Sequence, residues 1–135
     1  MFGIDLIQSN IYPLASGSYE LQQPMSYYYP YDEQESSEDR LVELFKESIE
    51  IAYSMDGIDY DIYDIIVVFH AGIGQDFALP FLDPTPEDIP STFIDSEMIN
   101  NSIGQDGITV GTANIDKGIL LPETQNHLNY EISNA

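Results

Sequence analysis

Apolar side chains recur at helical spacing between residues 41 and 52, and this repeat constrains the fold more than any other feature of the chain. The spacing is i, i+3, i+4, i+8 and i+11, and the residues are Leu41, Leu44, Phe45, Ile49 and Ala52. These positions share one face of an α-helix, so we expect an amphipathic helix that buries this face. Ser36 and Asp39 have the spacing of an N-terminal capping box, and Gly57 is expected to end the helix.

A run of consecutive apolar residues, Ile65–Phe69, follows this helix. Acidic residues precede the run and Ala71-Gly72 follows it, which is typical of a strand buried on both faces of a sheet. A helix followed by a buried central strand indicates a layered α/β or α+β arrangement. We predict an α+β fold in which one amphipathic helix packs on a small mixed β-sheet.

The segment before the helix, residues 1–36, has little periodicity and is rich in tyrosine and proline, which indicates an extended arm. We expect the tyrosines to clamp this arm onto the core, each ring burying its body while its hydroxyl stays in water. A stacking surface for sugars or aromatic ligands is the alternative.

Several shorter elements are expected after the buried strand. The proline-rich stretch 72–90 is expected to be a long loop, either functional or packed as a stiff wrap. The next residues are consistent with a short strand at Thr92–Ile94 or with a helical turn. Ile108–Val110 and Gly118–Leu121 are expected to form a hairpin or adjacent strands.

The charge of the chain restricts its partners. There are 24 aspartates and glutamates against three lysines and arginines, a formal net charge of −21. Phosphate groups would repel this charge, so it argues against nucleic acids and anionic membranes and favours divalent cations. The absence of cysteine excludes disulfides, thiolate nucleophiles and Cys-ligated metal sites. No apolar stretch approaches the length of a membrane span, and Met1–Ile7 lacks the pattern of a signal peptide.

Two groups of residues are candidate metal ligands. Asp56, Asp59 and Asp61 lie in one expected loop and offer the oxygen ligands that calcium prefers, although their spacing departs from the EF-hand template. A solvated acidic face is the alternative. His70 follows the buried strand, where sites collect in layered α/β folds, and is either a metal ligand or a hydrogen-bonded structural residue. His127 lies in a polar segment.

Three stretches carry a family resemblance when they are taken together: Tyr63–Asp76, Asp83–Pro90 and Gly118–Gln125. Together with the helix before them, they give the order helix, strand, long loop and strand ending in Pro-Glu. This order resembles the N-terminal part of a secreted zinc metallopeptidase domain of the immune-inhibitor-A-like group of zincins. The resemblance begins near Arg40 and implies that residues 37–135 are a partial metallopeptidase-like α+β domain, similar to part of a zincin N-terminal subdomain. It also implies an extracellular location.

The resemblance has consequences for zinc and substrate. In such enzymes two histidines of an H-E-x-x-H helix and a downstream ligand hold zinc, and the motif glutamate activates the metal-bound water. This chain does not contain the motif, and the resemblance places the zinc helix after the strand that ends in Pro-Glu. It implies that Gly118, Ile119, Leu120 and Leu121 form an edge strand that pairs with an extended peptide substrate. Family members also bind structural calcium.

Three hypotheses follow for the function. In the first, the chain is the upstream portion of a secreted metallopeptidase-like domain without activity on its own, and part of its apolar sheet is exposed because a covering layer is missing. In the second, it is a small acidic binding module for a cation or a protein, with no catalytic role. In the third, His70, His127 and loop acids assemble an active metal centre.

Overall fold

The structure is a computed structural model that describes residues 8–29, 37–74 and 89–124. Its longest element is helix α2 (Ser37–Asp56). Its buried face carries the predicted stripe together with one further residue: Leu41, Val42, Leu44, Phe45, Ile49 and Ala52. The helix ends before Gly57, whose φ of +61° is a left-handed conformation that glycine adopts without strain. The predicted helix is confirmed, while Ser36 of the expected capping box lies outside the described residues.

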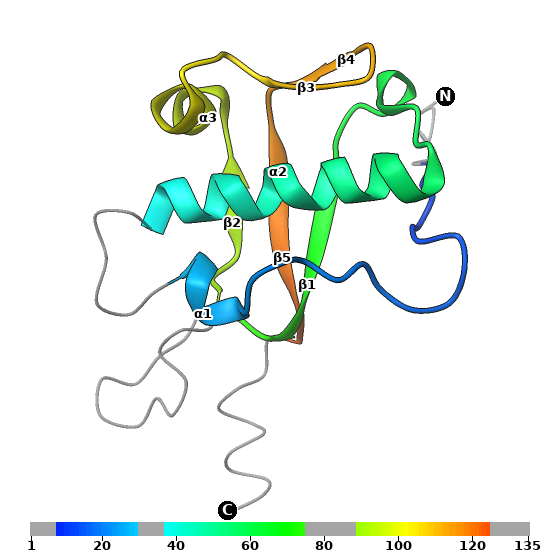
Figure 1. Cartoon of the computed structure of the whole chain (residues 1–135), viewed down its shortest axis with the longest axis horizontal. Coiled ribbons are helices and arrows are strands. Elements are labelled where there is room, and N and C mark those ends of the chain that lie inside the picture. The colour runs from blue at the N-terminus through cyan, green and yellow to red at the C-terminus, as the bar shows by residue number, and fades with distance from the viewer. Residues whose placement is uncertain (1–7, 30–36, 75–88, 125–135) are drawn as a thin grey trace, which may run out of the picture.

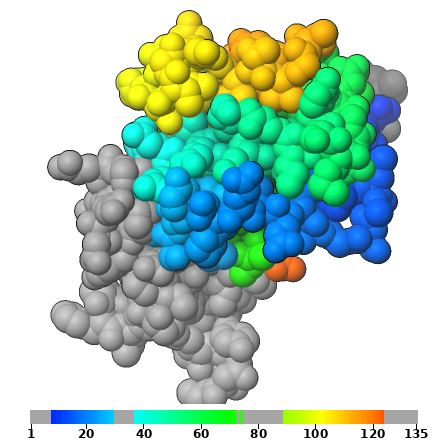
Figure 2. Space-filling model, in the orientation of Figure 1, coloured from blue at the N-terminus to red at the C-terminus, as the bar shows by residue number. Residues whose placement is uncertain are grey.

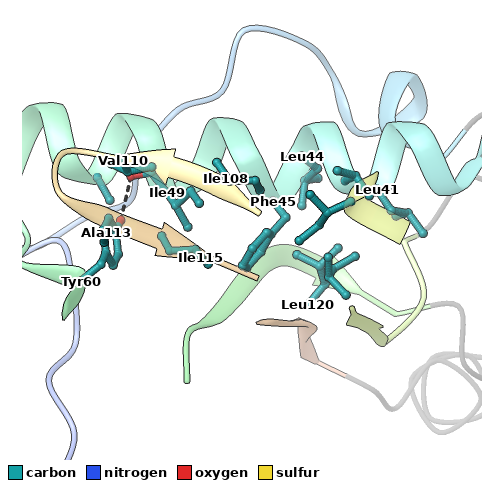
Figure 3. Close-up of a cluster of buried hydrophobic side chains, with 14 of the residues drawn as sticks. Leu41, Leu44, Phe45, Ile49, Tyr60, Ile108, Val110, Ala113, Ile115 and Leu120 are labelled. Atoms are coloured by element: carbon teal, nitrogen blue, oxygen red, sulfur yellow. Dashed lines mark hydrogen bonds between the residues drawn. The ribbon is translucent and has the colours of Figure 1, made fainter. Parts of the chain in front are cut away.

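Helix α2 lies across a mixed β-sheet (Figure 1). Within the described residues this sheet consists of β1 (Val67–Ile73), β5 (Gly118–Thr124) and β2 (Thr92–Ile94), in the order β1-β5-β2. β1 runs parallel to β5, and β2 runs antiparallel to it. Phe45 of α2 and Leu120 of β5 are fully buried where helix and sheet meet (Figure 3). The predicted α+β fold, an amphipathic helix on a small mixed sheet, is confirmed.

The prediction that Ile65–Phe69 is a central strand buried on both faces is wrong. β1 begins at Val67 and lies at one edge of the described sheet. The exposed fractions are 47% for Ile65, 39% for Val67 and 68% for Phe69, whereas Ile66 and Val68 pack against the core. Successive side chains of a strand point to opposite faces, so only one face of β1 looks toward α2.

Both elements considered for the segment after residue 90 are present. Strand β2 leads into helix α3 (Ser96–Ile103), which packs against α2. The side chain of Asp95 caps this helix by accepting a hydrogen bond from the backbone N–H of Met98 at 2.9 Å. Most of the predicted loop 72–90 lies outside the described residues, and its first two residues belong to β1.

A separate two-stranded hairpin follows α3. It consists of β3 (Ile108–Val110) and β4 (Ala113–Ile115), and it packs against α2 and the short 3₁₀-helix η2 (Tyr60–Ile62). The expected pairing of Ile108–Val110 with Gly118–Leu121 is therefore wrong. Gly111, with a φ of +60°, allows the chain to turn back within two residues, so that residue 118 is free to start a strand of the other sheet.

The described part of the arm, residues 8–29, runs alongside α2 and includes the short helix α1 (Met25–Tyr28) (Figures 1 and 2). Three of its tyrosine hydroxyls donate hydrogen bonds to carboxylates of α2: Tyr19 to Asp56, Tyr27 to Glu43 and Tyr28 to Glu47. The ring of Tyr28 is part of the hydrophobic core. The predicted tyrosine clamp is confirmed for these residues, with helix carboxylates in place of water as the hydroxyls' partners.

Candidate functional site

His70, a predicted metal ligand, has the environment of a structural histidine. It lies on β1 and is buried. Its Nδ1 lies 3.0 Å from the carbonyl oxygen of Ala71, and its Nε2 lies 3.1 Å from the carbonyl oxygen of Ile89. A carbonyl oxygen only accepts hydrogen bonds, and each tautomer of an imidazole has one N–H group, so the tautomer decides which of the two ring nitrogens donates to its carbonyl. The imidazole thus ties β1 to the chain that leads into β2, and this geometry favours the structural alternative.

The three aspartates of the predicted calcium site each have a separate partner. Asp56 accepts a hydrogen bond from Tyr19. Asp59 Oδ1 accepts from the backbone N–H of Asp61 at 3.2 Å, at the start of η2. Asp61 Oδ2 accepts from the hydroxyl of Thr112 at 2.6 Å. These carboxylates cap a turn or join neighbouring segments of the fold.

The described part of the chain contains no group of three or more acidic or histidine side chains that could hold a metal ion. His127, the other histidine of the third hypothesis, lies outside that part. A polar hollow of about 190 Å³ beside β4 is lined by Asp61, Asp64 and Asp116, and Lys117 lies among these acids. Zinc stays an implication of the family resemblance, and calcium stays a prediction from the sequence.

The predicted substrate-binding residues Gly118, Ile119, Leu120 and Leu121 begin strand β5, but this strand is internal. Ile119 lies between Val67 of β1 and Phe93 of β2, and its N–H donates to the carbonyl of Ile66 at 3.0 Å. The prediction of an edge strand is wrong, because the backbone of β5 is paired on both sides at this point. An extended peptide can add only where a strand has an unpaired edge.

Gly118 has a packing role instead. A Cβ atom at this position would lie 2.2 Å from Cζ of Phe45 and 3.1 Å from the carbonyl oxygen of Ile66. The first distance is far below van der Waals contact, so only glycine lets the Phe45 ring of α2 rest on the start of β5. This contact helps to hold the helix against the inner face of the sheet.

The outer face of the sheet, turned away from α2, is apolar and exposed. The register aligns its side chains in two rows across the strands, Val67–Ile119–Phe93 and Phe69–Leu121. Phe69 is 68% exposed and Phe93 is 54% exposed, while Ile119 and Leu121 are partly buried. We call these five residues the open sheet face, and it is the candidate functional site of this chain.

The composition of the open sheet face is unusual for a surface in contact with water. Where one face of a sheet meets solvent, its side chains are commonly polar. Large contiguous apolar patches on folded domains are commonly binding surfaces. The sequence analysis missed this site because a continuous apolar run such as Ile65–Phe69 shows no alternation that would separate an inner from an outer face.

Acidic residues lie at both ends of the open sheet face. Asp64 precedes β1, Asp95 follows β2 and Asp116 precedes β5, and the strand directions place all three at the same end of the sheet. At the other end, the carboxylate of Glu123 accepts from the backbone N–H of Gly72 at 3.4 Å. The rim of this apolar surface is therefore negative.

The basic residues offset little of this charge. The chain has three lysines and arginines. The guanidinium carbon of Arg40 lies 3.8 Å from the centre of the Tyr27 ring, and Lys46 forms an ion pair with Glu50 at 2.7 Å on the surface of α2. Only Lys117, which precedes β5, adjoins the open sheet face.

The tyrosines around α2 are held in their protonated form. Burial, together with the hydrogen bond to Asp56, raises the pKa of Tyr19 well above its ordinary value. Burial and the bond to Glu47 do the same for the pKa of Tyr28. Burial raises the pKa of Tyr60 to about 12. A tyrosine that acts as a nucleophile or base needs the opposite shift, so these hydroxyls are structural donors.

Comparisons with protein-family models, with curated proteins and with solved structures find no match to this chain. Among the described residues, no helix combines the length and the apolar character needed to cross a membrane.

Proposed function

We propose that this chain is the upstream portion of a metallopeptidase-like domain and that its described residues are a scaffold without catalytic activity. The observation that carries this proposal is the open sheet face. Sheets built of parallel strands are generally covered on both faces, and β1 and β5 form a parallel pair. Here α2 covers one face, whereas Phe69 and Phe93 on the other are 68% and 54% exposed. Among the described residues, the sheet therefore has a covering layer on one face only.

The order of elements along the chain supports the same proposal. Helix α2, strand β1 and strand β5 follow one another in the order that the resemblance to zincins implies, and β5 contains the Pro122-Glu123 pair. The resemblance places the zinc-binding helix after this strand. Polypeptide that follows β5 is thus the proposed source of both the missing layer and the zinc ligands.

A peptide substrate would pair with a different strand from the one first expected. The outer strands of the described sheet are β1 and β2, because β5 lies between them. Main-chain pairing with a peptide requires an unpaired strand edge. The proposal therefore moves the peptide-binding edge from residues 118–121 to β1 or β2.

An acidic binding module with no catalytic role is the second candidate function. The exposure of Phe69 and Phe93 favours it as well, because a protein partner that covers the open sheet face would bury both rings. The two functions differ in the origin of the covering layer and in whether that layer brings a zinc site.

Expression of the chain together with the polypeptide encoded downstream in its own reading frame tests the proposal. We expect the longer protein to contain an H-E-x-x-H helix and to digest casein in a reaction that a zinc chelator stops. The matched controls are the 135-residue chain alone, expected to be inactive, and the longer protein with the motif glutamate changed to glutamine. A downstream frame without a zinc motif, or chelator-sensitive proteolysis by the 135-residue chain alone, would contradict it.

A further inference from the structure

We infer that the open sheet face binds an amphipathic helix whose apolar side is flanked by lysine or arginine residues. This inference rests on the proposed function, since it names the chemistry of the layer that covers the same face. It depends on three properties of the described residues: the shape of the face, its apolar rows and its acidic rim.

The shape of the face suits a single helix. β1 and β5 each have seven residues and lie side by side, so these two strands are about 23 Å long at roughly 3.3 Å per residue, and the two apolar rows, two residues apart, take up about 7 Å of that length. An α-helix of about 15 residues has the length of these strands at about 1.5 Å per residue. The inner face of the same sheet is already covered by a helix, α2, and layers of helices on both faces are the usual environment of parallel strands.

The apolar rows define where the helix would make contact. Phe69 and Leu121 lie in one row, and Val67, Ile119 and Phe93 lie in the next. The two phenylalanines are the most exposed of the five, so they have the most surface to lose to a partner. Aromatic side chains that fill a partner's apolar surface commonly dominate the binding energy of an interface.

The acidic rim selects the charge of the helix. Asp64, Asp95 and Asp116 lie at one end of the face and Glu123 lies near the other, with Lys117 as their basic neighbour. The whole chain carries a net charge of −21. A second copy would bring another −21 to the contact, so self-association through this face is opposed by charge repulsion. A helix with basic flanks would gain attraction at both ends of the face.

Titration of the chain with a synthetic peptide tests this inference. The probe is a helical peptide of about 15 residues with leucines on one side and lysines along its flanks, and the control peptide has glutamates in place of the lysines. Binding is measured by isothermal titration calorimetry at low and at high salt. The protein variants are Phe69→Ser and Phe93→Ser on the face, with Met55→Ser as the matched control, because Met55 is an exposed apolar residue of α2.

We expect one lysine peptide to bind per chain, and each phenylalanine substitution to weaken binding about tenfold, the loss that corresponds to one large apolar contact. Met55→Ser should leave the affinity unchanged, added salt should reduce it, and the glutamate peptide should not bind. Either phenylalanine variant is sufficient if the other fails to fold, as judged by its circular dichroism spectrum.

Three results would overturn the inference. Equal affinity for wild type and both phenylalanine variants would mean that the peptide is attracted by net charge alone. A free chain with twice the monomer mass of 15.2 kDa in light scattering, returned to monomer by Phe69→Ser, would assign the face to a second copy. A monomer that binds neither peptide would mean that the face does not accept a helix. None of these outcomes bears on proteolysis by the longer protein, so the proposed function is tested separately.

Discussion

Alanine substitutions on opposite faces of the same sheet should have very different costs. Leu120 of β5 is fully buried under α2, and removing a leucine side chain from such a site costs about 2–5 kcal/mol, because a cavity adds to the lost transfer free energy. Phe69 of β1 is 68% exposed, so about a third of its surface leaves water on folding. Full burial of a phenylalanine contributes about 1.5–3 kcal/mol, and a third of that is about 0.5–1 kcal/mol.

Urea unfolding followed by circular dichroism measures both costs as changes in the free energy of unfolding. A domain of this size typically has a total stability of about 5–15 kcal/mol, so Leu120→Ala should lower the midpoint strongly while Phe69→Ala should hardly move it. The slope of the transition should be the same in both variants if the denatured state is unchanged. A loss from Phe69→Ala equal to that from Leu120→Ala would refute the reasoning, because it would mean that the outer face of the sheet is covered.

Three further predictions concern the inner face and the tyrosines. Gly118→Ala should destabilise the chain by about 1–3 kcal/mol in the same urea assay, because the new methyl group collides with the Phe45 ring, and an unchanged midpoint would contradict this packing. Tyr28→Phe should cost about 1–2 kcal/mol, because it removes the hydrogen bond to the Glu47 carboxylate, and a neutral result would mean that the clamp contributes nothing. Burial raises the pKa of Tyr60 from 10.0 to about 12, so its contribution to stability is complete below pH 10.0 and is lost as the pH rises toward 12. Thermal unfolding at increasing pH should show this alkaline loss, and Tyr60→Phe should reduce it.

The helix was predictable because its signal is local. The repeat from Leu41 to Ala52 places five apolar residues on one face, and no other regular structure has that period. Gly57 then ends the helix where a left-handed residue is needed. The tyrosine clamp followed from the same kind of reasoning, since a dense group of aromatic rings in an extended arm has few ways to avoid water other than packing on the core.

The sheet order was not predictable, because strand pairing depends on contacts between segments distant in the sequence. β5 pairs with β1 about 50 residues upstream and with β2 on its other side, and nothing in the residues Gly118–Leu121 distinguishes a central from an edge strand. Ile108–Val110 pairs with Ala113–Ile115 of β4 across a two-residue turn, whereas the sequence pattern alone also fits a pairing with Gly118–Leu121. The resemblance to zincins placed the strands in order along the chain without fixing their neighbours.

The candidate site was missed for a related reason. The apolar run that contains Val67 and Phe69 predicts burial on both sides, and burial on the outer side depends on a layer that the described residues do not provide. The acidic residues after the helix suggested a calcium site instead. Asp56 and Asp61 accept hydrogen bonds from the hydroxyls of Tyr19 and Thr112, which are distant in sequence, and Asp59 caps the turn that contains Asp61. Composition alone does not reveal these partners.

Hydroxyl-radical footprinting of the chain, read out by mass spectrometry, decides whether α2 alone covers the sheet. Phe45 lies on the inner face and is 0% exposed, whereas Phe69 and Phe93 on the open sheet face are 68% and 54% exposed. We expect both outer rings to be oxidised readily and Phe45 to be protected. Protection of Phe69 and Phe93 equal to that of Phe45 would show a covered sheet, and it would remove the basis for both the scaffold function and the helix-binding face.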